Sequence, residues 1–248
     1  MRRHAGRASA ALVLPVLLVG SLAWGAPAGA GMPRDGRAAT AVPQRQELIV
    51  LVGPTPALAA PRPGARTLRI VSAKRPLTWE RTTLPVVGRR TGPQGARWLR
   101  VRLPGRPNGQ TGWIRRSATL RASTPWHLVV DLAARRTTVY HSGHRIRTFP
   151  AIIGKPSTPT PRGRFFVEES VAMRARDVGG PYALALSARS DVLQVFAGGP
   201  GQIALHGRRN VGGVLGTAVS HGCVRLDDDA MRWLAQRIGP GTPVTIRG

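Results

Sequence analysis

Hydrophobic residues come in short runs separated by glycine- and proline-rich turns, a pattern typical of β-sheet proteins. From Trp98 to Leu103 apolar and polar residues alternate with a period of two, which predicts a half-buried strand. In the first half of the chain, similar runs predict strands at 68–71, 84–87 and 112–114. In the second half, strands are predicted at 126–132, 136–140, 144–153, 163–167, 203–206 and 243–247. We therefore expect a mainly β protein.

One segment near the end of the chain has the period of a helix instead. Met231, Leu234 and Ile238 recur on one helical face, and three aspartates at 227–229 precede them. Carboxylates at a helix N-terminus accept hydrogen bonds from free N–H groups and complement the helix dipole. Gly239-Pro240 then ends the pattern. The sequence thus predicts a single C-terminal helix.

Changes in composition divide the chain. Residues 31–65 are rich in Ala, Pro, Gly and Arg, so we interpret them as a linker. They contain one apolar island at 48–52, which suits a short strand or a docking segment. Residues 66–121 predict a small antiparallel β-barrel, with Trp79, Trp98 and Trp113 in its core. Residues 125–248 predict one β-rich domain.

The first thirty residues have the organisation of a cleaved signal peptide. Arg2, Arg3 and Arg7 precede the apolar stretch 8–22, and Ala28-Gly29-Ala30 offers a small-residue cleavage site. The apolar stretch is shorter than the roughly 20 residues that span a bilayer, so no retained transmembrane anchor is expected. We predict an exported protein.

The single cysteine of the chain, Cys223, lies in the run Ser-His-Gly-Cys-Val-Arg-Leu at 220–226, and His206 lies in Leu-His-Gly seventeen residues upstream. A lone thiol in an exported chain has no disulfide partner. An imidazole close to it can supply the base that a nucleophilic thiol needs. The arrangement indicates nucleophilic catalysis by Cys223.

Two alternatives remain open from the residues alone. Cysteine is often buried and inert. A zinc site formed by His206, His221 and Cys223 is chemically conceivable, but His221 and Cys223 are closer in sequence than the usual ligand spacing, and no acidic base stands nearby. We expect neither a metal nor another cofactor.

Three motifs together resemble the L,D-transpeptidase family of the YkuD type. They are GKPSTPTPRGRF at 154–165, IALHG at 203–207 and SHGCVRL at 220–226. The resemblance covers residues 125–248, about half of the chain. It implies a β-rich catalytic domain that cross-links peptidoglycan stem peptides through a cysteine thioester. The run WLRVRL followed by GWI, within 66–121, resembles bacterial SH3-like modules found beside cell-wall enzymes.

The resemblance also implies a role for each site residue. Cys223 is expected to be the nucleophile and His206 the base, with the second ring nitrogen of His206 held by the Gly207 carbonyl. The backbone N–H groups of His221, Gly222 and Cys223 are expected to bind the oxyanion. Arg225 is expected to bind a carboxylate of the stem peptide, and Ser220 to form a hydrogen bond with the histidine or with substrate. His221 is expected to shape the site and contact substrate, and Tyr182 to lie in the pocket wall.

The segment 208–219, between base and nucleophile, contains Gly212, Gly213 and Gly216 and suits either a mobile loop over the site or an ordinary hairpin connection. Two alternatives to the transpeptidase also remain. An L,D-carboxypeptidase would transfer the same thioester to water, and a non-catalytic wall-binding protein would use only the SH3-like module and the basic surface.

The chain is strongly basic, with a formal net charge of +26. Removing residues 1–30 takes away three arginines and no acids, which leaves +23. Such an excess favours association with polyanions. Export makes nucleic acid an unsuitable partner, whereas anionic cell-wall polymers fit, although a compositional bias towards arginine also contributes.

Overall fold

Two large sheets contain most of the strands in residues 41–248, the part of the chain that the computed structural model describes. The predicted signal peptide, residues 1–30, lies outside this range, as do residues 31–40. We call residues 41–124 the N-terminal module and residues 125–248 the C-terminal domain. Strand β7 ends at Thr124 and β8 begins at Trp126, so a single residue, Pro125, connects the two sheets along the chain.

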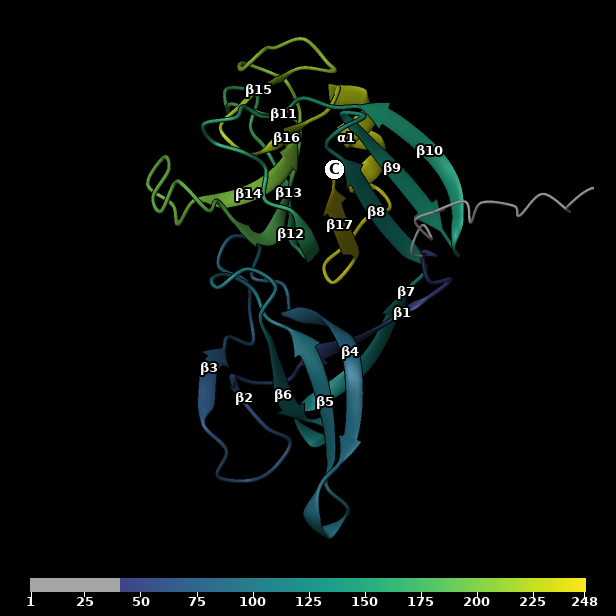
Figure 1. The fold of residues 1–248 in the computed structure, drawn as a ribbon, viewed down its shortest axis with the longest axis vertical. Helices are drawn as coiled ribbons and strands as arrows, with labels where there is room; N and C mark the ends of the chain where they lie inside the picture. The colour runs from purple at the N-terminus through teal and green to yellow at the C-terminus, as the bar shows by residue number, and fades with distance from the viewer. Residues whose placement is uncertain (1–40) are drawn as a thin grey trace, which may run out of the picture. The chain divides into compact units, whose positions relative to one another are not determined.

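The N-terminal module is a seven-stranded sheet in the order β3-β2-β6-β5-β4-β1-β7 (Figure 1). Its strands are β1 (Gln46–Leu51), β2 (Thr55–Leu58), β3 (Thr67–Val71), β4 (Thr83–Thr91), β5 (Arg97–Arg102), β6 (Thr111–Arg115) and β7 (Thr119–Thr124). Leu99 and Val101 of β5 are buried and Arg100 between them is exposed, as the period of two predicts, while Trp98 on the opposite face is buried as well. The predicted SH3-like relationship stays a prediction.

Two expectations for this region are wrong. Part of the predicted linker is sheet, because β1 pairs with β4 and β7 and buries Ile49 and Leu51 completely. Trp79 was expected in the core but is 70% exposed, since it lies in a turn with a positive φ of 59°. Trp98 is buried as expected, and Trp113 is half-buried.

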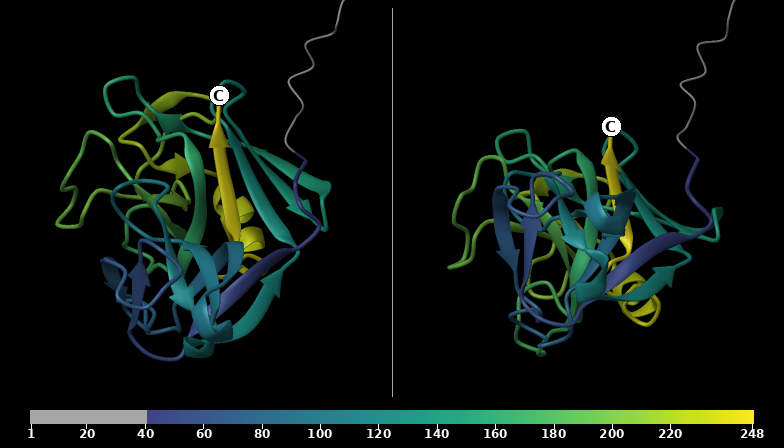
Figure 2. Two further views of the ribbon diagram at one scale, coloured as in Figure 1. Left: turned by 60° about the horizontal axis from the view of Figure 1, so that its bottom comes forward. Right: turned by 90° about the horizontal axis from the view of Figure 1, so that it is seen from below.

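The C-terminal domain contains an eight-stranded sheet in the order β10-β9-β8-β17-β12-β13-β14-β16. These strands are β8 (Trp126–Asp131), β9 (Arg136–His141), β10 (His144–Pro150), β12 (Gly163–Ala172), β13 (Tyr182–Arg189), β14 (Gln202–His206), β16 (Val224–Arg225) and β17 (Pro243–Arg247). Strands β11 (Ile153–Gly154) and β15 (Ala218–Ser220) form a separate pair. Figure 2 shows the last strand, β17 in yellow, running between earlier strands rather than at an edge.

Helix α1 (Asp228–Ala235) is the single α-helix of the described residues, as predicted. Asp227 is its N-cap, and its side chain accepts a hydrogen bond from the N–H of Asp229. Met231, Leu234 and Ile238 are buried against the sheet, although Ile238 lies beyond the end of the helix. The C-terminal domain is therefore mainly β with one helix.

Strand β12 contributes to the cores of both parts. Successive side chains of a strand point to opposite faces, so Phe165 packs in the core of the C-terminal domain and Phe166 in the core of the N-terminal module. A register irregularity between Val167 and Glu169 follows, and both Glu168 and Glu169 contact the N-terminal module. The two parts thus share one strand.

None of the helices in residues 41–248 is long and apolar enough to cross a membrane.

Candidate active site

Cys223 lies in the turn between β15 and β16. The turn needs Gly222, whose φ of +117° is one that other residues rarely adopt. Strand β16 then pairs in parallel with β14, with Val224 opposite Leu205 and Arg225 opposite His206. The pairing brings the thiol and the imidazole to the same end of the sheet, where both line one cavity.

The ring of His206 is held by one backbone carbonyl. Its Nδ1 lies 2.8 Å from the carbonyl oxygen of Gly207, as the resemblance implied. Because a carbonyl only accepts, Nδ1 must carry the hydrogen, and in the neutral ring Nε2 is left with its lone pair. The hydrogen bond therefore selects the tautomer that a general base requires.

Close packing of two glycines fixes this ring. A Cβ on Gly179 would stand 2.5 Å from Nδ1 of His206, and one on Gly207 would stand 1.9 Å from the carbonyl oxygen of Gly180. The N–H of Gly207 donates to the carbonyl of Gly179 at 2.8 Å. The role of Gly179 was not foreseen, because the contact joins segments 27 positions apart and glycine carries no chemical signal of its own.

Ser220 has different partners from those expected. It is fully buried, and its hydroxyl donates to the carbonyl of Cys223 at 2.6 Å and accepts from the N–H of Gly222 at 3.1 Å. Ser220 therefore braces the turn and touches neither the histidine nor the cavity. The N–H of Gly222, predicted to bind an oxyanion, is already engaged, which leaves those of His221 and Cys223 as candidates.

The proline-rich segment 154–161 supports the same turn from outside. The hydroxyl of Thr160 donates to the carbonyl of Gly222 at 2.8 Å and accepts from the N–H of Gly154 at 2.9 Å. Thr158 donates to the carbonyl of Ser220 at 3.3 Å, and the N–H of Lys155 donates to the same carbonyl at 2.9 Å. The motif at 154–165 thus positions the motif at 220–226, which contains Cys223.

The thiol opens onto a cavity of about 340 Å³. Its lining is mainly apolar, and its polar members include His206, His221 and Arg225. The ring of Phe196 stacks on that of His221, with centroids 5.5 Å apart. Tyr182, expected in the wall, instead packs against the domain core and does not line the cavity. Phe196 was not predicted.

Arg225 also lines the cavity. Its Nε is buried and has no hydrogen-bond partner among residues 41–248. The segment that covers this side, 208–219, is tied by Arg208 to the carbonyl of Gly213 at 2.9 Å and by Asn210 to that of Ala175 at 3.1 Å. Val211 of this segment lines the cavity.

Burial decides the protonation of the two reacting groups. Desolvation raises the pKa of the Cys223 thiol, although hydrogen bonding at Ala204 and the charge of Arg225 oppose it. Desolvation also lowers the pKa of His206, assisted by Arg225, while the Gly207 hydrogen bond opposes the change. The resting pair at neutral pH is therefore a neutral thiol beside a neutral imidazole.

No group of three His, Cys, Asp or Glu side chains within residues 41–248 is arranged to hold a metal ion. The zinc alternative therefore has no donor set in this part of the chain.

Residues 125–246 match the model of the YkuD family, the L,D-transpeptidase catalytic domain. The C-terminal domain therefore belongs to this family, as the three motifs suggested. The match begins one residue after β7 ends and contains both Cys223 and His206.

Two curated relatives agree with the assignment. L,D-transpeptidase 1 of Mycobacterium tuberculosis is 32% identical over 132 residues, which are 48% of this chain and 49% of the relative. YkuD of Bacillus subtilis is 32% identical over 125 residues, which are 49% of this chain and 66% of the relative. The chain thus spans about half to two thirds of the length of these relatives.

Solved structures of the same class are more distant. An L,D-transpeptidase from Mycobacterium smegmatis is 21% identical, with a TM-score of 0.38 over 66% of this chain and 99% of that one. The complex of LdtMt1 with imipenem is 23% identical, with a TM-score of 0.41 over 78% of this chain and 100% of that one.

Proposed function

We propose that the protein is an exported L,D-transpeptidase that cross-links peptidoglycan stem peptides, with Cys223 as nucleophile and His206 as base. The family of residues 125–246 supports the reaction class. The observation that carries the residue roles is the hydrogen bond between His206 Nδ1 and the Gly207 carbonyl, which leaves Nε2 free to take a proton at the thiol's end of the cavity.

The first step forms the thioester. His206 Nε2 accepts the thiol proton while Sγ attacks the carbonyl carbon that joins the third residue of the donor stem to its terminal D-amino acid. The tetrahedral intermediate collapses, and the amine of the D-amino acid leaves with the proton from His206. The N–H groups of His221 and Cys223 stabilise the oxyanion in this proposal.

The second step resolves the thioester. An amine on the third residue of an acceptor stem attacks the thioester carbonyl, His206 takes the amine proton, and the thiol is regenerated. Water in place of the amine would give an L,D-carboxypeptidase by the same chemistry. The guanidinium of Arg225, whose Nε lacks a partner among residues 41–248, suits a carboxylate of the donor stem.

The experiment is product analysis by mass spectrometry after incubation of residues 31–248 with purified disaccharide-tetrapeptide. A cross-linked dimer that is absent with Cys223→Ala supports the transpeptidase. Free tripeptide without dimer indicates the carboxypeptidase. An unchanged substrate, or activity that survives Cys223→Ala, would contradict the mechanism. Circular dichroism of the variant checks that it is folded.

A carbapenem provides a second test of the nucleophile. We expect imipenem to increase the intact mass of the wild-type protein by one acyl adduct and to leave Cys223→Ala unchanged. The adduct forms because the thiol attacks the β-lactam carbonyl as it would attack the donor amide. An unmodified wild-type protein would count against an activated thiol.

We further propose that the N-terminal module binds anionic cell-wall polymers at a cleft of about 490 Å³. Five arginines line it and only one acid, Glu47, which pairs with Arg89; the others are Arg90, Arg97, Arg116 and Arg121. The side chains of Arg90, Arg97 and Arg121 are exposed. Such a concave cationic surface attracts polyanions.

Binding of inorganic polyphosphate tests this cleft. We expect Arg97→Gln combined with Arg121→Gln to weaken binding more than Arg145→Gln combined with Arg147→Gln, which removes the same charge from exposed β10. Equal losses would show that net charge alone attracts the polymer. Export is tested separately, because secretion and cleavage predict a mature N-terminus near residue 31 by mass spectrometry of the secreted protein.

A further inference from the structure

The segment of residues 190–201 forms one wall of the cavity at Cys223. It connects β13 to β14, and Leu193, Phe196 and Gly201 line the cavity directly. Phe196 also stacks on His221, which precedes the nucleophile by two residues. The conformation of this segment therefore determines the shape of the cavity beside the thiol.

The segment has little apolar packing of its own to hold it. Val192, Val195 and Phe196 are exposed, and their apolar side chains are not part of either core. Most of its internal hydrogen bonds are local, from the N–H groups of Val192 and Leu193 to the Ser190 hydroxyl and between Phe196 and Gly199. One backbone hydrogen bond, from the N–H of Ser190 to the carbonyl of Gly201 at 2.7 Å, joins the two ends of the segment. The residues between these ends need further support from elsewhere.

Arg106, from the β5–β6 loop of the N-terminal module, supplies that support. Its Nη2 donates to the carbonyls of Ser190 at 2.8 Å and Leu193 at 3.1 Å, and its Nη1 donates to that of Pro200 at 2.9 Å. These carbonyls lie at the two ends of the segment, so one planar guanidinium closes it. Gly201 completes the junction, because a Cβ there would stand 2.0 Å from the Leu193 carbonyl oxygen.

Asn108, from the same loop, holds the start of the segment. Its Nδ2 donates to the carbonyl of Arg189 at 2.7 Å and to the Asp191 carboxylate at 2.9 Å, and its Oδ1 accepts from the N–H of Arg189 at 2.9 Å. The side chain of Asn108 thus pairs with the backbone of Arg189 as a neighbouring strand would. It fixes the direction in which the chain leaves β13.

Arg189 connects this anchor to a second contact between the module and the domain. Its guanidinium donates to Glu168 at 3.1 Å and to the carbonyls of Leu186 and Ala188, and Glu168 in turn pairs with Arg75 of the module. Burial and the nearby charge of Arg106 lower the pKa of Arg189 to about 10, so it remains charged at neutral pH.

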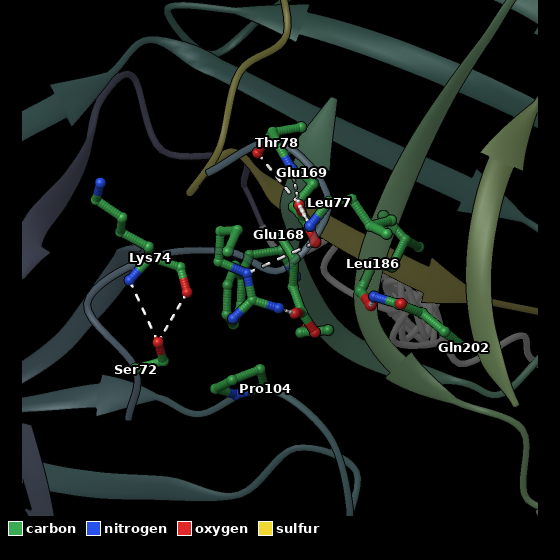
Figure 3. Close-up of polar contacts among 12 residues, drawn as sticks. Ser72, Lys74, Leu77, Thr78, Pro104, Glu168, Glu169, Leu186 and Gln202 are labelled. Carbon is green, nitrogen blue, oxygen red and sulfur yellow. Dashed lines mark hydrogen bonds and ion pairs between the residues drawn. The ribbon is translucent and has the colours of Figure 1, made fainter. Parts of the chain in front are cut away.

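Figure 3 shows the neighbourhood of this second contact. Glu168 and Glu169 face the module loop that carries Leu77 and Thr78, while Gln202 lies beside Leu186. Glu169 accepts from the N–H groups of Leu77 and Thr78. The Nε2 of Gln202 donates to the Leu186 carbonyl at 3.0 Å, and the carbonyl of Gln202 lies 4.0 Å from Sγ of Cys223. The residues on either side of the segment 190–201 are therefore both held: Arg189 by Asn108, and Gln202 by Leu186 close to the thiol.

We propose that Arg106 and Asn108 are positioning residues for the active site: the N-terminal module holds residues 190–201 in the conformation that shapes the donor pocket beside Cys223. The module then has a part in acyl transfer in addition to any binding of cell-wall polymers. The structural half of this inference stands without the proposed function, and only its consequence for acylation rests on it.

Hydrogen exchange tests the structural half. We expect Arg106→Ala to increase amide exchange in residues 190–201 by about tenfold or more, because the segment then closes without its main anchor. Arg106→Lys should give a smaller increase, since one ammonium cannot reach both ends. The matched control is Arg102→Ala, which removes another module arginine that donates to the domain, at the Arg164 carbonyl 3.2 Å away. Unchanged exchange with Arg106→Ala, or an equal increase with Arg102→Ala, would overturn the proposal.

Two reactions of Cys223 test the consequence. We expect Arg106→Ala to slow acylation by imipenem by about tenfold, because this reaction needs an ordered pocket. Alkylation by iodoacetamide needs only access to the thiol and should be as fast as in the wild type or faster. Loosened exchange without slower acylation would show that the wall is dispensable. If the wild type is not acylated at all, the proposed function fails, and the exchange experiment still decides whether the module holds the wall.

Discussion

At the scale of single residues, the site depends on two neutral groups rather than on a preformed ion pair. Desolvation raises the pKa of Cys223 and lowers that of His206, and the charge of Arg225 also disfavours the imidazolium. In the proposed mechanism the proton therefore moves from Cys223 to His206 as the new bond forms. The free Nε2 of His206 serves this purpose only while the Gly207 carbonyl holds the ring.

The pH dependence of alkylation checks this description. The rate with iodoacetamide should rise with pH and show no plateau below about pH 9, because the thiolate is the reactive form and the pKa of Cys223 is raised above its usual range. An alkylation rate that rises and levels off between about pH 5 and 7 would instead indicate an imidazolium–thiolate pair. His206→Gln serves as control, since it removes the titrating base.

The protein should still catalyse acyl transfer at slightly acidic pH. His206 must be neutral to act as base, and its pKa is lowered from the usual value of about 6.5. The acid limb of kcat/KM for the tetrapeptide should therefore lie below pH 6.5. An acid limb above that value would contradict the burial of the imidazole.

At the scale of elements, Cys223, the proposed nucleophile, depends on a turn that three segments support. Strand β16 fixes one end through its pairing with β14, Ser220 closes the turn internally, and Thr158 and Thr160 bind its carbonyls from the segment 154–161. Loss of this support should displace the turn and, with it, the thiol of Cys223.

Thr160→Val tests this support. Valine keeps the volume but leaves the Gly222 carbonyl and the Gly154 N–H without their partner, at a cost of about 1–3 kcal/mol each. We expect acylation by imipenem to slow by about tenfold as the turn loses its position. Thr138→Val, which removes a hydroxyl contact on the exposed β9–β10 pair, should change nothing. Equal rates in the two variants would contradict the role of Thr160.

Strand β8 contains a separate pH-sensitive group. His127 lies 2.9 Å from the hydroxyl of Thr245 on β17, and burial together with Arg164 lowers its pKa to about 4. The unfolded chain binds this proton near pH 6.5, so the contribution of His127 to stability is complete above pH 6.5 and is lost as the pH falls towards 4. The difference amounts to roughly 3 kcal/mol at most.

Denaturant unfolding at several pH values measures the effect. Between about pH 6.5 and 4, the free energy of unfolding should fall less steeply in His127→Gln than in the wild type. The difference in slope corresponds to at most one proton bound on unfolding. His144→Gln, on exposed β10, serves as control and should keep the wild-type slope. An unaltered slope in His127→Gln would show that this histidine is not buried in its neutral form.

The sequence was sufficient for elements whose signal is local and insufficient for those that depend on distant partners. Residues 243–247 were predicted as a strand and form β17 with the same bounds. For β1 the sequence left a short strand or a docking segment open, because its apolar residues are flanked by Pro- and Ala-rich segments and its partners β4 and β7 lie 30 to 80 positions away. Trp98 begins a predicted strand and is buried, whereas Trp79 lies outside the predicted strands, in a turn with a positive φ of 59° that leaves it exposed.

The same distinction applies to the site. His206, Cys223 and the Gly207 contact follow from motifs in which neighbouring residues carry the chemistry. Phe196 and Arg106 were missed because their contacts join segments 25 and more than 80 positions apart. Ser220 was assigned to the wrong partner, since a hydroxyl beside a catalytic residue does not reveal which side of the turn it faces.

At the scale of the whole molecule, the two sheets are connected through β12. Phe166 is 1% exposed within the core of the N-terminal module although it belongs to the sheet of the C-terminal domain. Arg75, Arg106 and Asn108 add polar contacts around the same boundary. We infer that the two parts unfold cooperatively.

Phe166→Ala tests this cooperativity. Removing the ring should lower the free energy of unfolding by about 3–5 kcal/mol and increase hydrogen exchange in β5 and β6, which belong to the other sheet. Phe165→Ala is the matched control, because the adjacent ring packs in the core of the C-terminal domain. Increased exchange confined to the C-terminal domain in both variants would contradict the coupling.

The position of β17 has a consequence for the order of folding. Val244 of this strand pairs with Leu128 of β8, 116 positions earlier, and its other side pairs with β12. Until the ribosome has made residues 243–247, β8 and β12 both present unpaired edges, which are prone to aggregate. Contacts so distant in sequence also form slowly. The sheet that carries the thiol can therefore close only after residues 243–247 have been synthesised, and the edges of β8 and β12 stay unpaired until then.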